Sequence, residues 1–87
     1  MNGKYVYVIC NETRPDLTSR VYEVCSTEEK AWEEVEKIYY KHLHFLQSVG
    51  DIIDNIKIDN RTITITYLSH LTYCASLISI FKRPFAE

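Results

Sequence analysis

The chain has 87 residues, of which 46% are hydrophobic and 25% are charged, and its formal net charge is -2. This length predicts a single domain spanning 1-87, and the hydrophobic fraction excludes a disordered chain. The charge disfavours a general nucleic-acid binder, which carries a basic stripe. The chain contains only two glycines, Gly3 and Gly50, which excludes the glycine-rich loops that cradle nucleotide phosphates.

The three cysteines are Cys10, Cys25 and Cys74. An odd number does not make a disulfide framework, and no pair has the close spacing of a zinc or redox motif. Lys, Asp, His or Ser interrupts every long apolar stretch, so no segment has the pattern of a membrane span. We therefore expect reduced thiols, a cytoplasmic location, no metal and no cofactor.

The first predicted elements are two strands joined by a loop. Lys4–Cys10 is dense in Tyr, Val and Ile, residues that fit a pleated strand. This strand is apolar on both faces, as expected for a central strand. The polar segment Asn11–Ser19 predicts a loop, and Arg20–Cys25 predicts the second strand. Together they predict a hairpin.

The next segment predicts a long amphipathic helix over Thr27–Val49. Ser26 followed three residues later by Glu29 is typical of a capping box, and Gly50 is placed to end the helix. At 100° per residue, the apolar stripe consists of Ala31, Trp32, Val35, Ile38, Tyr39, His42, Leu46 and Val49, flanked by Leu43 and Phe45.

The last part of the chain predicts three more strands. After a polar break at Asp51–Asn55, the segments Ile56–Asp59 and Thr62–Tyr67 alternate strictly and flank a two-residue turn. That turn pairs Ile58 with Ile63 and, two residues on, a second pair of isoleucines on the same face.

The final predicted element is a strand over Tyr73–Phe81, with a short helix at Ser69–Leu77 as the alternative. The element order is then β-β-α-β-β-β. We therefore expect an α+β fold, in which one long helix packs on one face of an antiparallel sheet.

Catalytic chemistry has weak support in the sequence. His42 and His44 are two residues apart on the predicted helix and point away from each other, so they cannot share a metal ion. His42 is expected to be a hydrogen-bonded core residue, and His44 to be solvated or in an interface near Tyr40. A Cys–His nucleophile pair is the best enzymatic option, but no spacing singles out a pair. We expect a protein that is not an enzyme.

One helix face is acidic. Its stripe consists of Glu29, Glu33 and Glu36, and it ends at Tyr40. The stripe could dock on a basic partner. The alternative is a solvated face with ordinary pairs, Glu33–Lys37 and Lys30–Glu34.

The seven tyrosines and the uncovered sheet face favour a binding function. Tyrosine is common in interfaces, and a single helix leaves one face of a sheet bare. We expect a homodimer or a bound partner protein, with nucleic acid and membrane disfavoured. The candidate partner-binding residues are Tyr5, Tyr7, Glu29, Glu33, Glu36, Tyr40 and His44.

The stretch YVYVIC…RVYEVCSTEEKAWEEVEKI, within about the first 40 residues, resembles the opening of small phage and mobile-element proteins of unknown function. This resemblance implies a phage-encoded protein that acts inside a bacterium. The expected function is a protein-interaction module that inhibits a host defence or regulatory protein, in the manner of anti-CRISPR proteins. The alternatives are a small nucleic-acid-binding regulator and a small thiol-dependent hydrolase.

Overall fold

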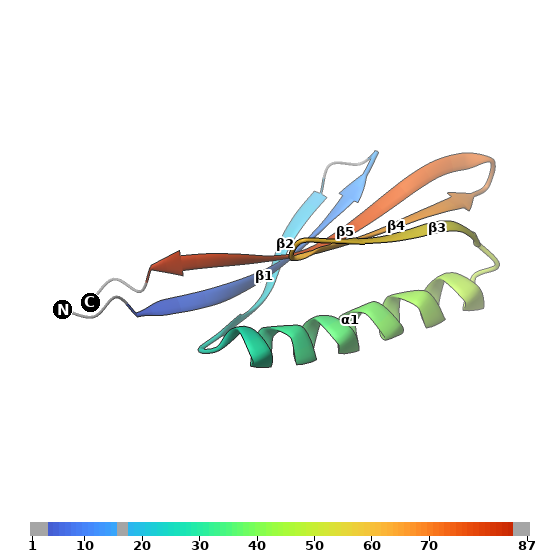
Figure 1. Cartoon of the computed structure of the whole chain (residues 1–87). Helices are drawn as coiled ribbons and strands as arrows, with labels where there is room; N and C mark the ends of the chain where they lie inside the picture. The colour runs from blue at the N-terminus through green and yellow to red at the C-terminus, as the bar shows by residue number, and fades with distance from the viewer. Residues whose placement is uncertain (1–3, 16–17, 85–87) are drawn as a thin grey trace.

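The computed structural model describes residues 4–15 and 18–84 as one helix and a five-stranded antiparallel sheet (Figure 1). The elements are β1 (Tyr5–Arg14), β2 (Thr18–Cys25), α1 (Glu28–Ser48), β3 (Ile52–Asp59), β4 (Thr62–Ser69) and β5 (Thr72–Pro84). The sheet order is β2-β1-β5-β4-β3. The expected fold class, α+β, is confirmed, and the elements follow one another in the expected order, although all five strands are longer than predicted.

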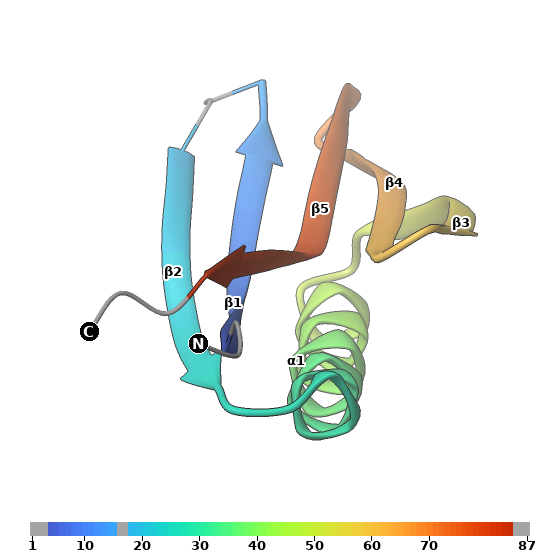
Figure 2. The same cartoon turned by 60° about the vertical axis from the view of Figure 1, so that its left-hand side comes forward.

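The helix packs against one face of a strongly twisted sheet (Figure 2). The buried side chains come from both layers and are Ile9, Cys25, Ala31, Val35, Leu46, Ile63, Ile65, Ser76, Ile78 and Ile80. Within this core, Ile9 lies opposite Ile80 and Ile63 lies opposite Ile78 in neighbouring strands. Burial of these isoleucines between helix and sheet supplies most of the free energy that holds the two layers together.

The caps of α1 differ in part from the prediction. Thr27, with an extended backbone, is the N-cap, and its hydroxyl accepts a hydrogen bond from the Lys30 N–H at 3.1 Å. The predicted cap at Ser26 is therefore wrong by one residue, because both residues are competent caps and the packing of the apolar stripe decides between them. The C-terminal prediction is confirmed: Gly50 has φ +82° and closes a Schellman motif.

The loop predicted at Asn11–Ser19 is wrong at both of its ends, and its residues 16 and 17 lie outside the described part of the chain. β1 continues to Arg14, because β5 pairs with it along its whole length, and β2 already begins at Thr18. The Asn11 side chain donates to the Ser76 hydroxyl at 3.0 Å and to the Leu77 carbonyl at 3.1 Å. The predicted polar break is also wrong, since β3 already begins at Ile52. A neighbouring strand supplies hydrogen-bond partners for the backbone N–H and C=O groups, so that polar residues with low strand propensity also form strand.

The C-terminal strands follow the predicted register. Ile58 pairs with Ile63 and Ile56 with Ile65 across the β3–β4 hairpin. The segment after it forms β5 at the centre of the sheet, so the alternative helix is wrong. Near the chain ends, β1 and β5 continue as a two-stranded extension beyond β2 and β4, and the molecule measures 53 × 22 × 19 Å (Figure 1).

Candidate functional site

A groove lies between α1 and the edge strand β3. Arg61, in the β3–β4 turn, binds Glu28 at the start of the helix through two contacts: Nε to Oε2 at 3.1 Å and Nη2 to Oε1 at 3.3 Å. This pair holds the end of β3 near the beginning of α1, so that helix and strand run in opposite directions. The hollow between them has a volume of about 640 Å³. Its lining consists of Glu29, Trp32, Glu33, Val35, Glu36, Tyr39, Tyr40, Ile58 and Ile63.

The floor of this groove, which we call the α1–β3 groove, is apolar and partly aromatic. Val35 and Ile63 are buried beneath it, and Trp32 and Tyr39 pack against the core. Tyr40 and Ile58 are 60% and 69% exposed. β3 lies at one edge of the sheet, so its outer side has no neighbouring strand among the described residues. The groove therefore joins exposed apolar side chains to an unpaired strand edge.

Three carboxylates surround the apolar floor without a partner. The rim residues Glu29, Glu33 and Glu36 form no hydrogen bond or ion pair within the described part of the chain. The other four described glutamates are all partnered: Glu12 with Arg14, Glu23 with the Cys25 thiol, Glu28 with Arg61, and Glu34 with Lys37. The unpartnered glutamates are thus confined to the groove.

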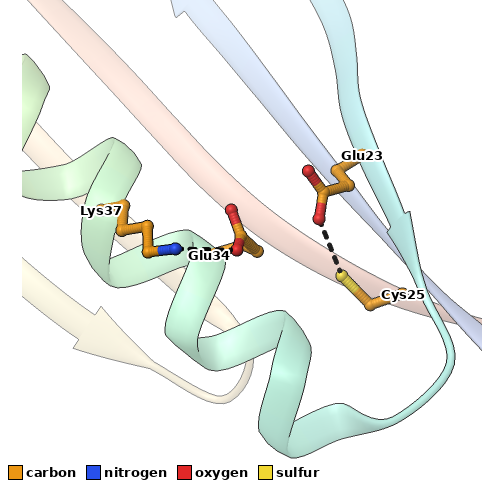
Figure 3. Close-up of polar contacts among 4 residues, drawn as sticks. All are labelled: Glu23, Cys25, Glu34 and Lys37. Atoms are coloured by element: carbon orange, nitrogen blue, oxygen red, sulfur yellow. Dashed lines mark hydrogen bonds and ion pairs between the residues drawn. The ribbon is translucent and has the colours of Figure 1, made fainter.

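The ion pairs predicted on the helix surface were wrong. Lys37 pairs with Glu34 at 3.2 Å (Figure 3). No ion pair joins Lys37 to Glu33 or Lys30 to Glu34. Glu34 points towards β2, where the Glu23 carboxylate accepts a hydrogen bond from the Cys25 thiol (Figure 3). Lys37 bonds to Glu34 and also lines a shallow hollow with Glu33, Glu36 and Tyr40. Glu33 itself forms no hydrogen bond or ion pair within the described residues.

The structure brings together four of the seven predicted site residues, namely Glu29, Glu33, Glu36 and Tyr40. Tyr7 packs against the core on the helix side of the sheet. Tyr5 lies in the two-stranded extension, with the Lys82 Nζ 4.3 Å from the centre of its ring. His44 is exposed, as predicted, but does not line the groove.

Sequence reasoning missed five residues that line the groove, namely Trp32, Val35, Tyr39, Ile58 and Ile63. The three on the helix were assigned to its apolar stripe, and the two isoleucines to the shared face of the hairpin. The predicted isoleucine register is correct, but β3 lies at the edge of the sheet, where α1 covers it only in part. The alternation of Ile58 with polar neighbours gave no sign of this, because a half-buried strand has the same pattern.

The sheet face opposite α1 is not the tyrosine-bearing face that we expected. Alternation along β1 places Tyr5 and Tyr7 on the helix side with the buried Ile9. The open face instead carries the apolar residues Val6, Val8, Val24, Leu77 and Phe81, beside Thr62, Thr64 and Thr66 of β4. Val24 and Phe81 are 57% and 41% exposed.

The cysteines and histidines show no activated pair. Burial, and then the hydrogen bond to Glu23, raise the pKa of the Cys25 thiol, which disfavours the reactive thiolate. The Cys74 thiol donates to the Thr72 carbonyl. Within the described residues, no cysteine is hydrogen-bonded to a histidine, and no group of three His, Cys, Asp or Glu side chains could hold a metal ion.

His42 differs from its predicted state. Its Nε2 is buried without a hydrogen-bond partner, so the expected hydrogen-bonded histidine is wrong. The ring instead packs edge-on against Tyr67, with ring centres 6.2 Å apart. Burial lowers the pKa of His42 below its ordinary value of 6.5. The side chain therefore behaves as a largely apolar packing group.

No protein-family model matches this chain, and neither a curated protein nor a solved structure shows significant similarity to it. Among the described residues, the one helix lacks the continuous apolar length needed to cross a membrane.

Proposed function

We propose that this protein is a non-enzymatic interaction module that binds another protein in the α1–β3 groove. The observation that carries this proposal is the exposed apolar floor beside an unpaired strand edge. Interface anchors are usually aromatic or large apolar side chains that a partner buries. Trp32, Tyr40 and Ile58 provide such side chains within one hollow.

The electrostatics of the groove favour a protein over a nucleic acid as the partner. Glu29, Glu33 and Glu36 place negative charge around the floor, and this charge repels phosphate groups. The resemblance of the first 40 residues to phage proteins directs the search to bacterial hosts. We propose that the module inhibits a host defence or regulatory protein by occupying its surface.

The test is affinity capture from bacterial lysate, with and without nuclease treatment, followed by mass spectrometry. Ile58→Thr removes an exposed anchor but keeps strand propensity. Val24→Thr makes the same kind of change on the open face and serves as the matched control. We expect a nuclease-resistant, stoichiometric protein partner that Val24→Thr retains and Ile58→Thr loses.

Circular dichroism must show that both variants are folded. A partner that disappears on nuclease treatment would support the nucleic-acid-binding alternative instead. A protein partner retained equally by both variants would place the interface outside the groove and contradict the proposal.

A further inference from the structure

We propose that the α1–β3 groove binds an extended, basic segment of its partner, which adds to the sheet as a strand along β3. This inference rests on the proposed function and specifies the chemistry of the partner. Its first support is the edge itself. The bulge between Ile53 and Asn55 interrupts the start of β3, so the regular unpaired edge comprises Asn55–Asp59. An extended segment can pair with those backbone groups as a strand does.

The second support is the charge pattern on the opposite wall. The rim residues Glu29, Glu33 and Glu36 are four and three positions apart, which separates them along the helix axis by about 6 and 4.5 Å. Alternate residues of a strand are about 6.6 Å apart. The first carboxylate spacing is close to this repeat, and the second is shorter by about 2 Å, a difference that a long Lys or Arg side chain can span. A strand laid along β3 with Lys or Arg at alternate positions therefore presents its basic side chains to successive carboxylates.

The third support is the apolar floor between edge and rim. A Lys or Arg side chain carries a long apolar stem and a charged head. The stem can cover Ile58 and Trp32 while the head reaches a rim carboxylate, and the rings of Trp32 and Tyr40 favour a nearby cation. Basic side chains alone can therefore satisfy both the floor and the rim.

A second copy of this chain does not fit the groove. Antiparallel pairing of β3 with β3 of another copy has its two-fold axis perpendicular to the sheet, so both helices lie on the same face. The two sets of Glu29, Glu33 and Glu36 would then face one another across the joined edges. Repulsion between like charges opposes that arrangement, whereas a basic partner segment relieves it.

The test uses a nine-residue peptide in which four arginines alternate with threonines. One control peptide has the same composition with its arginines contiguous, and a second has glutamate in place of arginine. Binding is measured by titration calorimetry at low and at physiological salt. The acidic rim is neutralised in the triple variant E29Q/E33Q/E36Q. The matched triple variant E12Q/E23Q/E34Q makes the same change in net charge at glutamates outside the groove.

We expect the alternating peptide to bind the native chain more tightly than the contiguous peptide, and the glutamate peptide not to bind. Neutralising the rim should weaken binding about tenfold at low salt, and the matched variant should leave it within about twofold. Amide hydrogen exchange should slow at residues 55–59 and stay unchanged in β2. Thermal denaturation checks that both triple variants remain folded.

Equal weakening in both triple variants, equal binding of both arginine peptides, or unchanged exchange in β3 would overturn the inference. Failure of this inference and failure of the proposed function are distinguishable. If Ile58→Thr loses the partner but E29Q/E33Q/E36Q binds it normally, the proposed function stands and the basic strand is contradicted. If Ile58→Thr retains the partner, the groove is not the binding site of the module, whatever the result with the peptides.

Discussion

The α1–β3 groove and the open face of the sheet both expose apolar side chains, but they differ in what surrounds them. The groove combines its apolar floor with three unpartnered carboxylates and an unpaired strand edge. On the open face, Val24 and Phe81 lie on either side of Val8, and the Arg83 guanidinium lies 5.2 Å from the centre of the Phe81 ring. The described glutamate of this face, Glu12, is paired with Arg14 at 2.6 Å. Exposed apolar area alone indicates that a surface binds a partner. Charged side chains and backbone groups without a partner of their own also indicate the chemistry of that partner.

The largest expected effect is the loss of stability when a side chain is truncated on the helix-covered face of the sheet, compared with the open face. Ile65 faces α1 and is fully buried, whereas Thr64, one position earlier in β4, faces the open side. Ile65→Ala should lower the free energy of unfolding by about 3 kcal/mol, because it leaves a cavity. Thr64→Ala should lower it by less than about 1 kcal/mol. Urea denaturation measures both, and similar losses would show that α1 does not define the buried face.

The second prediction is that the open face mediates a homodimer. The one described glutamate on this face, Glu12, is paired with Arg14, and two-fold dimers are the commonest soluble homo-oligomers. Light scattering should give twice the mass of 10.3 kDa at micromolar concentration. Phe81→Lys should weaken the dimer by about 2 kcal/mol, or thirtyfold. A concentration-independent monomer would leave the open face without a role in self-association.

Ile58→Glu is the matched control for this second prediction, because it places a charge in the groove instead of on the open face. The control variant should leave the dimer intact. Loss of the dimer in Ile58→Glu but not in Phe81→Lys would reverse the roles that we assign to the two surfaces.

The third prediction tests the start of the helix, which positions the acidic rim. Thr27→Ala should destabilise the protein by about 1 kcal/mol, because the Lys30 N–H loses its acceptor. Ser26→Ala, at the neighbouring position, should have little effect. Chemical denaturation of the two variants checks this order. The opposite order would move the start of the helix back by one residue.

The smallest expected effect is a pH dependence on the helix side of the sheet. The lowered pKa of His42 means that the unfolded chain, with the ordinary value of about 6.5, binds a proton first as the pH falls. The contribution of His42 to stability is thus present above pH 6.5 and is lost as the pH falls through the folded-state pKa. The charged groups that line the same depression are Glu34, Lys37 and Lys41.

Denaturation midpoints between pH 8 and pH 5 provide the measurement. His42→Phe should flatten the decline, whereas His44→Gln, which changes an exposed histidine on the same helix, should leave it as in the native chain. An unchanged slope in His42→Phe would show that burial of this ring does not couple stability to pH.

Local sequence patterns were sufficient to predict the order of the helix and strands and the pairing of β3 with β4. The alternation of isoleucines determined the β3–β4 register, because a shift by one residue would turn every apolar side chain to the wrong face. The acidic stripe of α1 was visible for a similar reason: helical periodicity alone places Glu29, Glu33 and Glu36 together. Gly50 marked the helix end through its tolerance of positive φ.

Only the tertiary structure decided which of these residues form a site. The sequence determines that Ile58 shares a face with Ile63, but the position of β3 at the sheet edge leaves Ile58 exposed and Ile63 buried. Asn11 and its polar neighbours became strand because β5 pairs with them. Glu33 lacks the expected ion pair because Lys37 bonds to Glu34 instead. Strand order and side-chain pairing depend on contacts between residues far apart in the chain, and periodicity within a segment carries no information about them.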